Sequence, residues 1–183
     1  MFKIISGFLV GVVFIGIMAF LFAGQFMFHE HESPFGVEET AARIQANIQS
    51  KAMADNGWKL SGLRDPSKAV AAAGGNVLPV LLIEACSTNY SGPILKDDDT
   101  RILSILMPCT ITVYKKDNGK TYIGMMNAGL MGQMFGSKVG EIMGYVAADQ
   151  MKFIEFDPNT PAPQLIKIQP GGGGAGGKDA GGC

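Results

Sequence analysis

Apolar residues are distributed very unevenly along the chain, and the longest run lies near its start. Residues 4–28 contain no charged side chain, and Gln25 is their only strongly polar one. As a helix this segment is about 37 Å long, which exceeds a hydrocarbon core of about 30 Å. We therefore expect residues 4–28 to form a transmembrane helix that acts as an uncleaved signal anchor. A cleaved signal peptide is the alternative, but its apolar region is usually only about 7–15 residues long.

The few charges around this segment predict its orientation. Lys3 precedes the apolar run, whereas Glu30 and Glu32 follow it. The positive-inside rule then places residues 1–3 in the cytoplasm. We expect a single-pass protein of a bacterial inner membrane, with the rest of the chain in the periplasm, where thiols are oxidised.

Small residues within the apolar run lie on two faces of the expected helix. Gly7 and Gly11 share one face, and Gly16, Ala19 and Ala23 gather on a nearly opposite one. Small residues allow helices to approach closely in lipid. The pattern predicts packing against other membrane subunits on two sides, although a simple anchor in the lipid bilayer also tolerates Gly and Ala.

The pattern then changes to one typical of a folded domain. Residues 29–36 are expected to form a linker, and apolar residues recur every three or four positions across 37–54, which predicts an amphipathic helix. Asp65 and Pro66 mark the start of a short helix. The remaining pattern predicts strands at 58–63, 76–87, 103–115 and 120–126, helices at 65–75 and 137–150, and a last strand at 151–156.

These elements predict an α+β fold. Three to five strands form a small sheet, and the two long helices cover it. Asn118 and Gly119 supply the positive φ angles of the hairpin turn between the third and fourth strands. We expect the domain to occupy residues 37–156, and residues 157–183, rich in Pro and Gly, to form a flexible tail.

Composition excludes several classes of function. Fifteen basic and 16 acidic residues give a formal charge of −1, so the chain lacks the basic surface that nucleic acids require. Its two histidines, His29 and His31, both lie just after the apolar run. A Ser-His-Asp or Cys-His arrangement within the domain would therefore have no base, which disfavours hydrolase chemistry.

Pro108 and Cys109 form an unusual pair within a predicted strand. Proline cannot donate to a sheet ladder, so Pro108 predicts a bulge or an edge that changes the direction of the next side chain. Three roles are open for Cys109: it is a small core residue, it forms a disulfide with Cys86, or it is a reactive or metal-binding thiol. Because the chain has no CxxC motif, a thioredoxin-type site is disfavoured.

Soft ligands gather around this cysteine. Met thioethers and Cys thiolates suit copper, and either residue ligates haem iron. Cys86, Cys109, Met107 and Met126 are therefore the candidate cofactor-binding residues, although methionine also fills irregular cores. The methionines of this region are Met107, Met125, Met126, Met131, Met134 and Met143.

Three other polar segments are weaker candidates. His29 and His31, with the neighbouring glutamates, offer a weak metal site but fit better as a solvated collar beside a membrane. The acidic run at 96–101 lacks the glycine and the ligand spacing of an EF-hand. Cys183, at the chain end, would form an intermolecular disulfide, accept a modification or remain a free thiol.

Several short motifs carry a resemblance to a known family. The segments "LLIEACSTNY", "LKDDDTRILSILMPCTITVY" and "DNGKTYIGMMN" occur in order before "MGQMFGSKVGEIMG". Over about residues 33–156 the chain resembles the family catalogued as domain of unknown function 302. Its characteristic positions are here Cys86, Pro108, Cys109, Met126 and Asn127. The resemblance implies a small α+β domain that often pairs into dimers, and it implies no activity.

These features favour an accessory or assembly subunit of a larger membrane complex. Its partners would be other membrane subunits, contacted through the apolar helix and the Gly-rich tail, with a homodimer as a further expectation. The alternative is a periplasmic redox, metal-binding or haem-binding module that uses Cys86 and Cys109.

Overall fold

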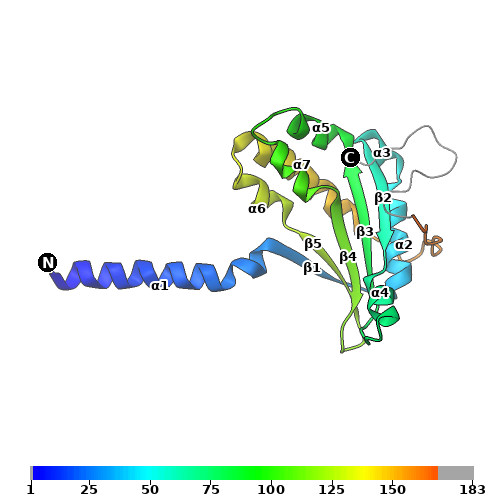
Figure 1. The fold of residues 1–183 in the computed structure, drawn as a ribbon, viewed down its shortest axis with the longest axis horizontal. Coiled ribbons are helices and arrows are strands. Elements are labelled where there is room, and N and C mark those ends of the chain that lie inside the picture. Colours follow the sequence, from blue (N-terminus) through cyan, green and yellow to red (C-terminus); the bar gives the residue numbers. More distant parts are fainter. Residues whose placement is uncertain (1, 169–183) are drawn as a thin grey trace.

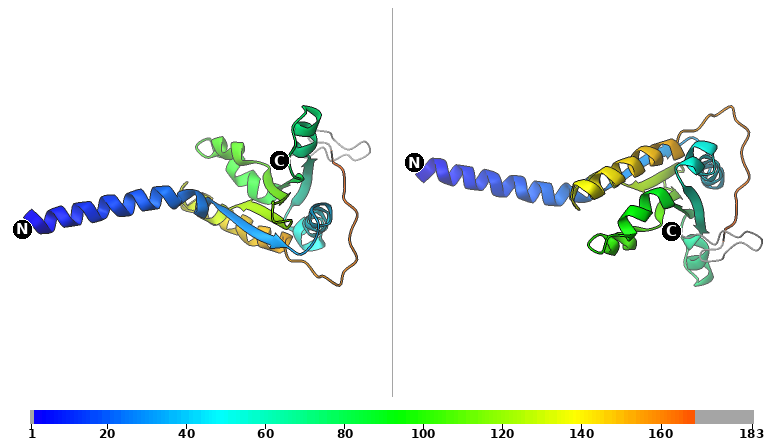
Figure 2. Two further views of the ribbon diagram at one scale, coloured as in Figure 1. Left: turned by 90° about the horizontal axis from the view of Figure 1, so that it is seen from below. Right: turned by 90° about the horizontal axis from the view of Figure 1, so that it is seen from above.

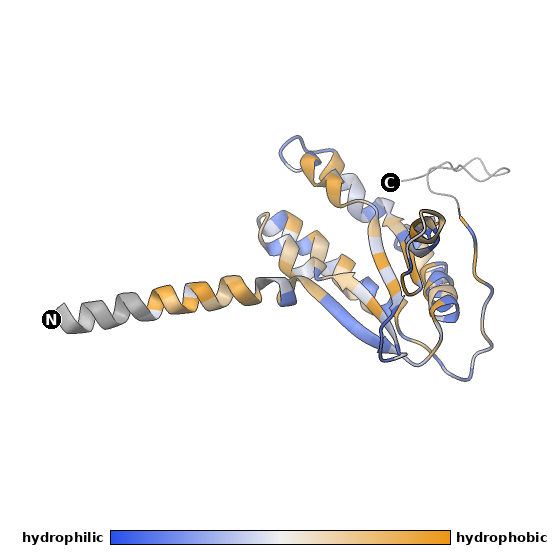
Figure 3. Cartoon of the chain, turned by 60° about the horizontal axis from the view of Figure 1, so that its bottom comes forward, coloured by the Kyte–Doolittle hydropathy of each residue, from blue (hydrophilic) through white to orange (hydrophobic). Residues whose placement is uncertain are grey.

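The computed structural model, which describes residues 2–168, begins with one long helix that stands away from the rest of the chain (Figure 1). This helix, α1 (Phe2–Met27), has 26 residues. Its side chains from Val12 onward are mostly exposed, and Figure 3 shows their apolar character. Among the described residues, no helix combines the length and the apolar character needed to cross a membrane.

The expected linker at 29–36 is largely a strand. Strand β1 (Phe28–Ser33) follows α1 directly and pairs with β5 (Thr121–Met126) in antiparallel register. Its glutamates have partners in the distant hairpin turn between β4 and β5: Lys116 lies 2.7 Å from Glu30, and Lys120 lies 2.9 Å from Glu32. The prediction failed here because these partners are far away in the sequence, whereas the local pattern has no apolar alternation.

Five strands form one antiparallel sheet, which confirms the predicted α+β class. Their order is β1-β5-β4-β3-β2, so β1 and β2 are the two edges. Gly119, at φ 80°, closes the hairpin between β4 and β5, whereas Asn118 keeps a negative φ, unlike the prediction. The other strands are β2 (Trp58–Arg64), β3 (Val80–Ser87) and β4 (Cys109–Lys115).

Two helices cover one face of this sheet (Figure 2). They are α2 (Val37–Ile48) and α7 (Ser137–Phe153), and they contact each other. The core lies between them and the alternate strand residues that point toward them. Its largest fully buried apolar side chains are Ile44, Ile48, Ile83, Ile111, Val113, Ile123 and Phe153.

A helical arm extends from the end of β3 and packs against α7 at that end of the sheet (Figure 2). It comprises α5 (Thr88–Leu95) and the 3-10 helix η1 (Arg101–Leu106). The predicted strand 103–115 is therefore wrong over its first residues, and β4 begins only at Cys109. The apolar run before Pro108 suggested a strand, yet Ile102 and Ile105 project outward from η1.

Short helices account for most of the remaining differences. The predicted helix 37–54 is interrupted at Gln49 and Ser50 and continues as α3 (Lys51–Asp55). Helix α4 (Pro66–Ala72) begins as predicted, with the Asp65 carboxylate accepting a hydrogen bond from the Lys68 amide at 3.0 Å. Helix α6 (Ala128–Gln133) was not expected.

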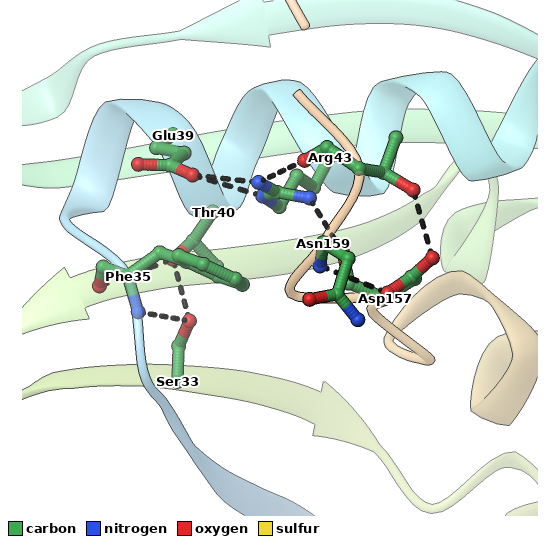
Figure 4. A network of polar contacts seen from close by, with 8 residues as sticks. Ser33, Phe35, Glu39, Thr40, Arg43, Asp157 and Asn159 are labelled. Atoms are coloured by element: carbon green, nitrogen blue, oxygen red, sulfur yellow. Dashed lines mark hydrogen bonds and ion pairs between the residues drawn. The ribbon is translucent and has the colours of Figure 1, made fainter. Parts of the chain in front are cut away.

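The segment after α7 is packed rather than free. The predicted strand 151–156 is wrong, because α7 continues to Phe153 and no strand follows it up to residue 168. The buried Arg43 side chain donates to the carbonyls of Asp157 and Thr160, and it also donates to Glu39 (Figure 4). Residues 157–168 therefore belong with the domain, whereas the rest of the predicted flexible tail lies outside the described residues.

A second buried residue of α2 holds this segment. The Gln45 side-chain amide donates to the Ile166 carbonyl at 2.9 Å and accepts from the Ile166 amide at 2.8 Å. Gln45 thereby pairs with the backbone as a neighbouring strand would. Farther on, the Leu63 amide of β2 donates to the Ile168 carbonyl. The segment thus runs from α2 to the β2 edge of the sheet.

Candidate functional site

The Pro108–Cys109 pair lies where the helical arm enters the sheet. Pro108 follows Met107 through a cis peptide bond and precedes the first residue of β4. Cys109 then pairs with Ala85 of β3. Because Pro108 stands outside the ladder, its missing amide hydrogen removes no sheet hydrogen bond. The pair thus marks a strand start and not a bulge within a strand.

Cys109 lines a small apolar cavity between the arm, α7 and the sheet. The cavity has a volume of about 40 Å³. Burial raises the pKa of the Cys109 thiol to about 11. The thiol is therefore protonated near neutral pH, and a protonated thiol is a poor nucleophile and a poor metal ligand. The cavity walls include Trp58, Tyr90, Leu106, Met107, Phe135 and Met143.

Cys86 lines the same cavity but differs in its bonding. Cys86 takes part in a disulfide bond, whereas Cys109 is a free thiol. The disulfide between Cys86 and Cys109 that the sequence left open is therefore absent. Cys183 lies outside the described residues.

A buried carboxylate fixes one wall of the cavity. Asp149 of α7 accepts hydrogen bonds from the Trp58 indole nitrogen at 2.9 Å, the Tyr90 hydroxyl at 2.9 Å and the Asn56 amide at 3.0 Å. Its other oxygen accepts from Lys152 at 2.9 Å. This arrangement ties α7 to β2, to α5 and to the turn before β2.

The hydrogen bonds around Asp149 decide its charge. Burial alone would raise the pKa of the carboxyl, but the donors Trp58, Lys152, Tyr90 and Asn56 together lower it. Burial and the Asp149 charge raise the pKa of Tyr90 to about 12. Asp149 is thus an anion held by neutral and cationic donors, an arrangement suited to structural support.

Sequence reasoning did not find Asp149, although a signal was present. The residue follows Val146 by three positions, so it continues the apolar stripe of α7 that begins at Val139. A carboxylate on the buried face of a helix needs hydrogen-bond donors from a neighbouring element. Its position therefore indicated a buried polar contact, but the sequence did not identify Trp58 as the donor.

The methionines do not converge on Cys109. Met107 and Met143 line its cavity, and Met125 and Met126 line the concave surface on the other side of the sheet. Met131 and Met134 line neither. Within residues 2–168 there is no group of three or more His, Cys, Asp or Glu side chains that would hold a metal ion.

The concave surface is larger and more open than the cavity. It has a volume of about 610 Å³ and lies against β1, β4 and β5, with η1 beside it. Cys109 lines both spaces. Tyr114 and Glu30 also line the concave surface. The Tyr114 hydroxyl donates a hydrogen bond to the Glu30 carboxylate, and burial together with that carboxylate raises the pKa of Tyr114 to about 12.

The histidines of β1 do not form a site with the neighbouring glutamates. Alternate strand residues point to opposite faces, so His29 and His31 share one face and Glu30 and Glu32 the other. The two imidazole centroids lie 6.3 Å apart. Since the glutamates pair with Lys116 and Lys120, the weak metal site that the four residues offered is not assembled.

The acidic run before η1 forms surface ion pairs. Lys138 at the start of α7 lies 2.9 Å from Asp97, and Arg101 lies 2.7 Å from Asp98. The first pair connects this loop to α7. No cation-binding geometry is needed to explain these carboxylates.

The junction between α1 and the domain depends on Asn127. Its side-chain amide donates to the Phe26 carbonyl at 3.0 Å, and its backbone amide donates to the Met27 carbonyl at 2.8 Å. Its side-chain oxygen accepts from the Leu130 amide at 3.1 Å and so caps α6. One residue thus secures the last turn of α1 and the first turn of α6.

Comparison with known proteins agrees with this fold. The family model described as "Domain of unknown function DUF302" matches residues 29–155. The crystal structure of an uncharacterized conserved DUF302 protein from Bacillus stearothermophilus is similar, with a TM-score of 0.60 and 17% sequence identity. The similarity covers 70% of this chain and 95% of that chain. No curated protein matches the chain.

Proposed function

This chain belongs to the family described as domain of unknown function DUF302, and from that premise we propose that it is a membrane-anchored accessory or assembly subunit of a larger membrane complex. The family match begins at residue 29, so α1 is an addition to the shared domain. An added helix that presents apolar side chains outward is suited to attach that domain to other components.

The anchor is the first part of the proposal. The sequence carries this part, because the side chains of residues 2–10 are not among those the structure describes. The uncharged run 4–28 would form a helix of about 37 Å at a rise of about 1.5 Å per residue, which is enough for a tilted span. Large apolar side chains cover it, and Phe20 is 82% exposed. So continuous an exposed apolar surface is unfavourable in water and marks a site of contact with a membrane or a protein. We place residues 4–28 in a bacterial inner membrane, with the N-terminus cytoplasmic and the domain periplasmic.

Packing against other helices is the second part. A methyl group built on Gly11 or Gly16 would meet no atom within 4 Å, so the chain itself does not fill these positions. Small residues at such positions let a partner helix approach closely. Ala19 continues the face of Gly16. Gly7 and Ala23, the remaining members of the two faces, lie outside the described side chains.

The observation that carries the proposal is the direct junction of α1 and β1. Met27 ends the helix and Phe28 begins the strand, and Asn127 fastens the joint from the neighbouring strand. A domain on a flexible tether would move independently of its anchor. Here a partner that binds α1 also positions the sheet, as an assembly subunit requires.

A matched pair of variants tests the helix-packing role. Gly16→Leu adds a bulky side chain to a small-residue face, whereas Ile15→Leu changes the neighbouring exposed residue conservatively. In affinity purification from native membranes with mild detergent, we expect Gly16→Leu to lose co-purifying membrane subunits and Ile15→Leu to keep them. Equal recovery of partners with both variants would contradict the role of the helix faces.

The redox, metal-binding or haem-binding alternative has less support. Cys86 is engaged in a disulfide, and burial raises the pKa of Cys109 to about 11, so neither sulfur is a ready thiolate. The cavity of about 40 Å³ is far too small for haem, because pockets for drug-sized ligands take about 300 Å³ or more. The concave surface, which Cys109 also lines, has about 610 Å³, and there the argument against a cofactor is the protonated Cys109 thiol. A homodimer through the open edge of β1 is a further proposal, although its glutamates make it a polar edge.

A further inference from the structure

Large apolar side chains are exposed on two neighbouring segments of the domain. Ile102 and Ile105 of η1 are 72% and 80% exposed, and Met134 and Phe135 after α6 are 67% and 43% exposed. We call these four residues the apolar rim. We propose that the apolar rim rests in the surface of the lipid bilayer that holds α1.

The two segments of the rim are adjacent to each other. Leu106 of η1 and Phe135 line the same cavity. Lys138, just after the second segment, lies 2.9 Å from Asp97 of the loop before η1. The two segments therefore border one cavity and are joined by an ion pair, so the rim lies on one part of the surface. Contiguous exposed apolar groups of this kind mark an interaction site, whereas single ones do not.

The position of the rim selects the bilayer as its partner. Asn127 caps the start of α6 and also binds the end of α1, and α6 contacts both α1 and α7. In Figure 1 and in both views of Figure 2, the arm and the turn after α6 lie on the side of the domain from which α1 leaves. A bilayer that contains α1 would meet these segments first.

The charges next to the rim fit an interfacial position. Asp97 and Asp98 are paired with Lys138 and Arg101, so these two acids do not face the surface as free charges. Interfacial segments bury apolar side chains at the boundary of headgroups and acyl chains while their polar groups stay in water. The contact is thus hydrophobic and does not require anionic lipid.

This inference rests on the proposed membrane anchor, and the experiment separates the two. The full-length chain is reconstituted into phosphatidylcholine vesicles with or without brominated acyl chains, which quench tryptophan on contact. Two variants each add one tryptophan to the buried native Trp58. Ile105→Trp places it on the rim. Val77→Trp places it at another exposed apolar position, just before β3 and near the hairpin end of the sheet.

The outcomes are distinct. We expect both variants to float with the vesicles, and brominated lipid to remove most of the added emission of Ile105→Trp and none of that of Val77→Trp. If both variants float and neither is quenched, the rim does not touch lipid and the inference is wrong, while the anchor stands. Rim quenching equal to that of Val77→Trp also contradicts it. If neither variant floats, the anchor and the rim contact both fail.

Discussion

The Asn127 side chain lies 3.0 Å from the Phe26 carbonyl and joins residues that are 101 positions apart in the sequence. This hydrogen bond holds the last turn of α1 at the point where β5 ends and α6 begins. The same side chain caps α6 through the Leu130 amide. A single amide group thus determines how the long helix meets the sheet, and its removal should affect both elements.

Replacing Asn127 tests this joint. We expect Asn127→Ala to lose the α6 cap, at a cost of about 1 kcal/mol, and to release the end of α1. Hydrogen–deuterium exchange should then rise across residues 26–33 and across α6. Asn127→Ser is the matched control. The serine hydroxyl still accepts a hydrogen bond from the Leu130 amide and so caps α6, but it does not replace the side-chain amide that donates to the Phe26 carbonyl. Unchanged exchange at 26–33 in both variants would show that Asn127 does not secure the joint.

Asp149 should be the most sensitive polar residue of the domain. Asp149→Ala leaves the buried Trp58 indole nitrogen without an acceptor, so we expect a loss of about 3 kcal/mol. For a chain of this size that corresponds to a fall in Tm of about 10 °C. Circular dichroism during heating in mild detergent measures it. Glu141→Gln, on the exposed side of the same helix, is the control and should leave the Tm nearly unchanged.

The Asp149 cluster also predicts a pH dependence. Hydrogen bonds lower the pKa of this carboxyl in the folded state, so its stabilising contribution is complete above the unfolded pKa of about 3.9. The contribution is lost as pH falls through the lower, folded pKa. The difference in Tm between wild type and Asp149→Asn should therefore be constant near neutral pH and shrink below about pH 4. A difference that grows on acidification would contradict the assignment.

Cys109 should react slowly in the native chain. Burial raises its pKa from 9.0 to about 11, which lowers the thiolate fraction near neutral pH about 100-fold. Alkylation by iodoacetamide should therefore be slow at pH 8 and accelerate up to about pH 11. Denaturant should restore the rate of an ordinary cysteine. Rapid native alkylation of Cys109, located by peptide mass spectrometry, would instead favour the redox alternative.

The parts of the fold with local signals could be predicted from the sequence. Asp65 and Pro66 correctly predicted the start of α4. The apolar spacing of α2 and α7 predicted two long helices that cover one sheet. The resemblance carried by Cys86, Pro108 and Cys109 agrees with the family that the comparison found. In each case the residues that determine the structure are neighbours in the sequence.

The missed features depend on distant partners. Strand β1 has few apolar residues, and it is fixed by pairing with β5 and by Lys116 and Lys120. Residues 157–168 have a composition typical of a loop, yet Arg43 and Gln45 hold their backbone. The apolar run before Pro108 has the spacing of a strand, but it forms η1. Its isoleucines face outward instead of joining the core, and the sequence pattern alone does not show this.

The proposal of an accessory subunit rests on partners, so native mass spectrometry tests it most directly. The full-length protein would be extracted from its own membrane in mild detergent, and co-purifying subunits and bound metal would be recorded in one experiment. We expect stoichiometric membrane subunits and no metal or haem. A lone chain or a dimer that carries copper or haem would contradict the proposal and would make Cys109 the centre of the function.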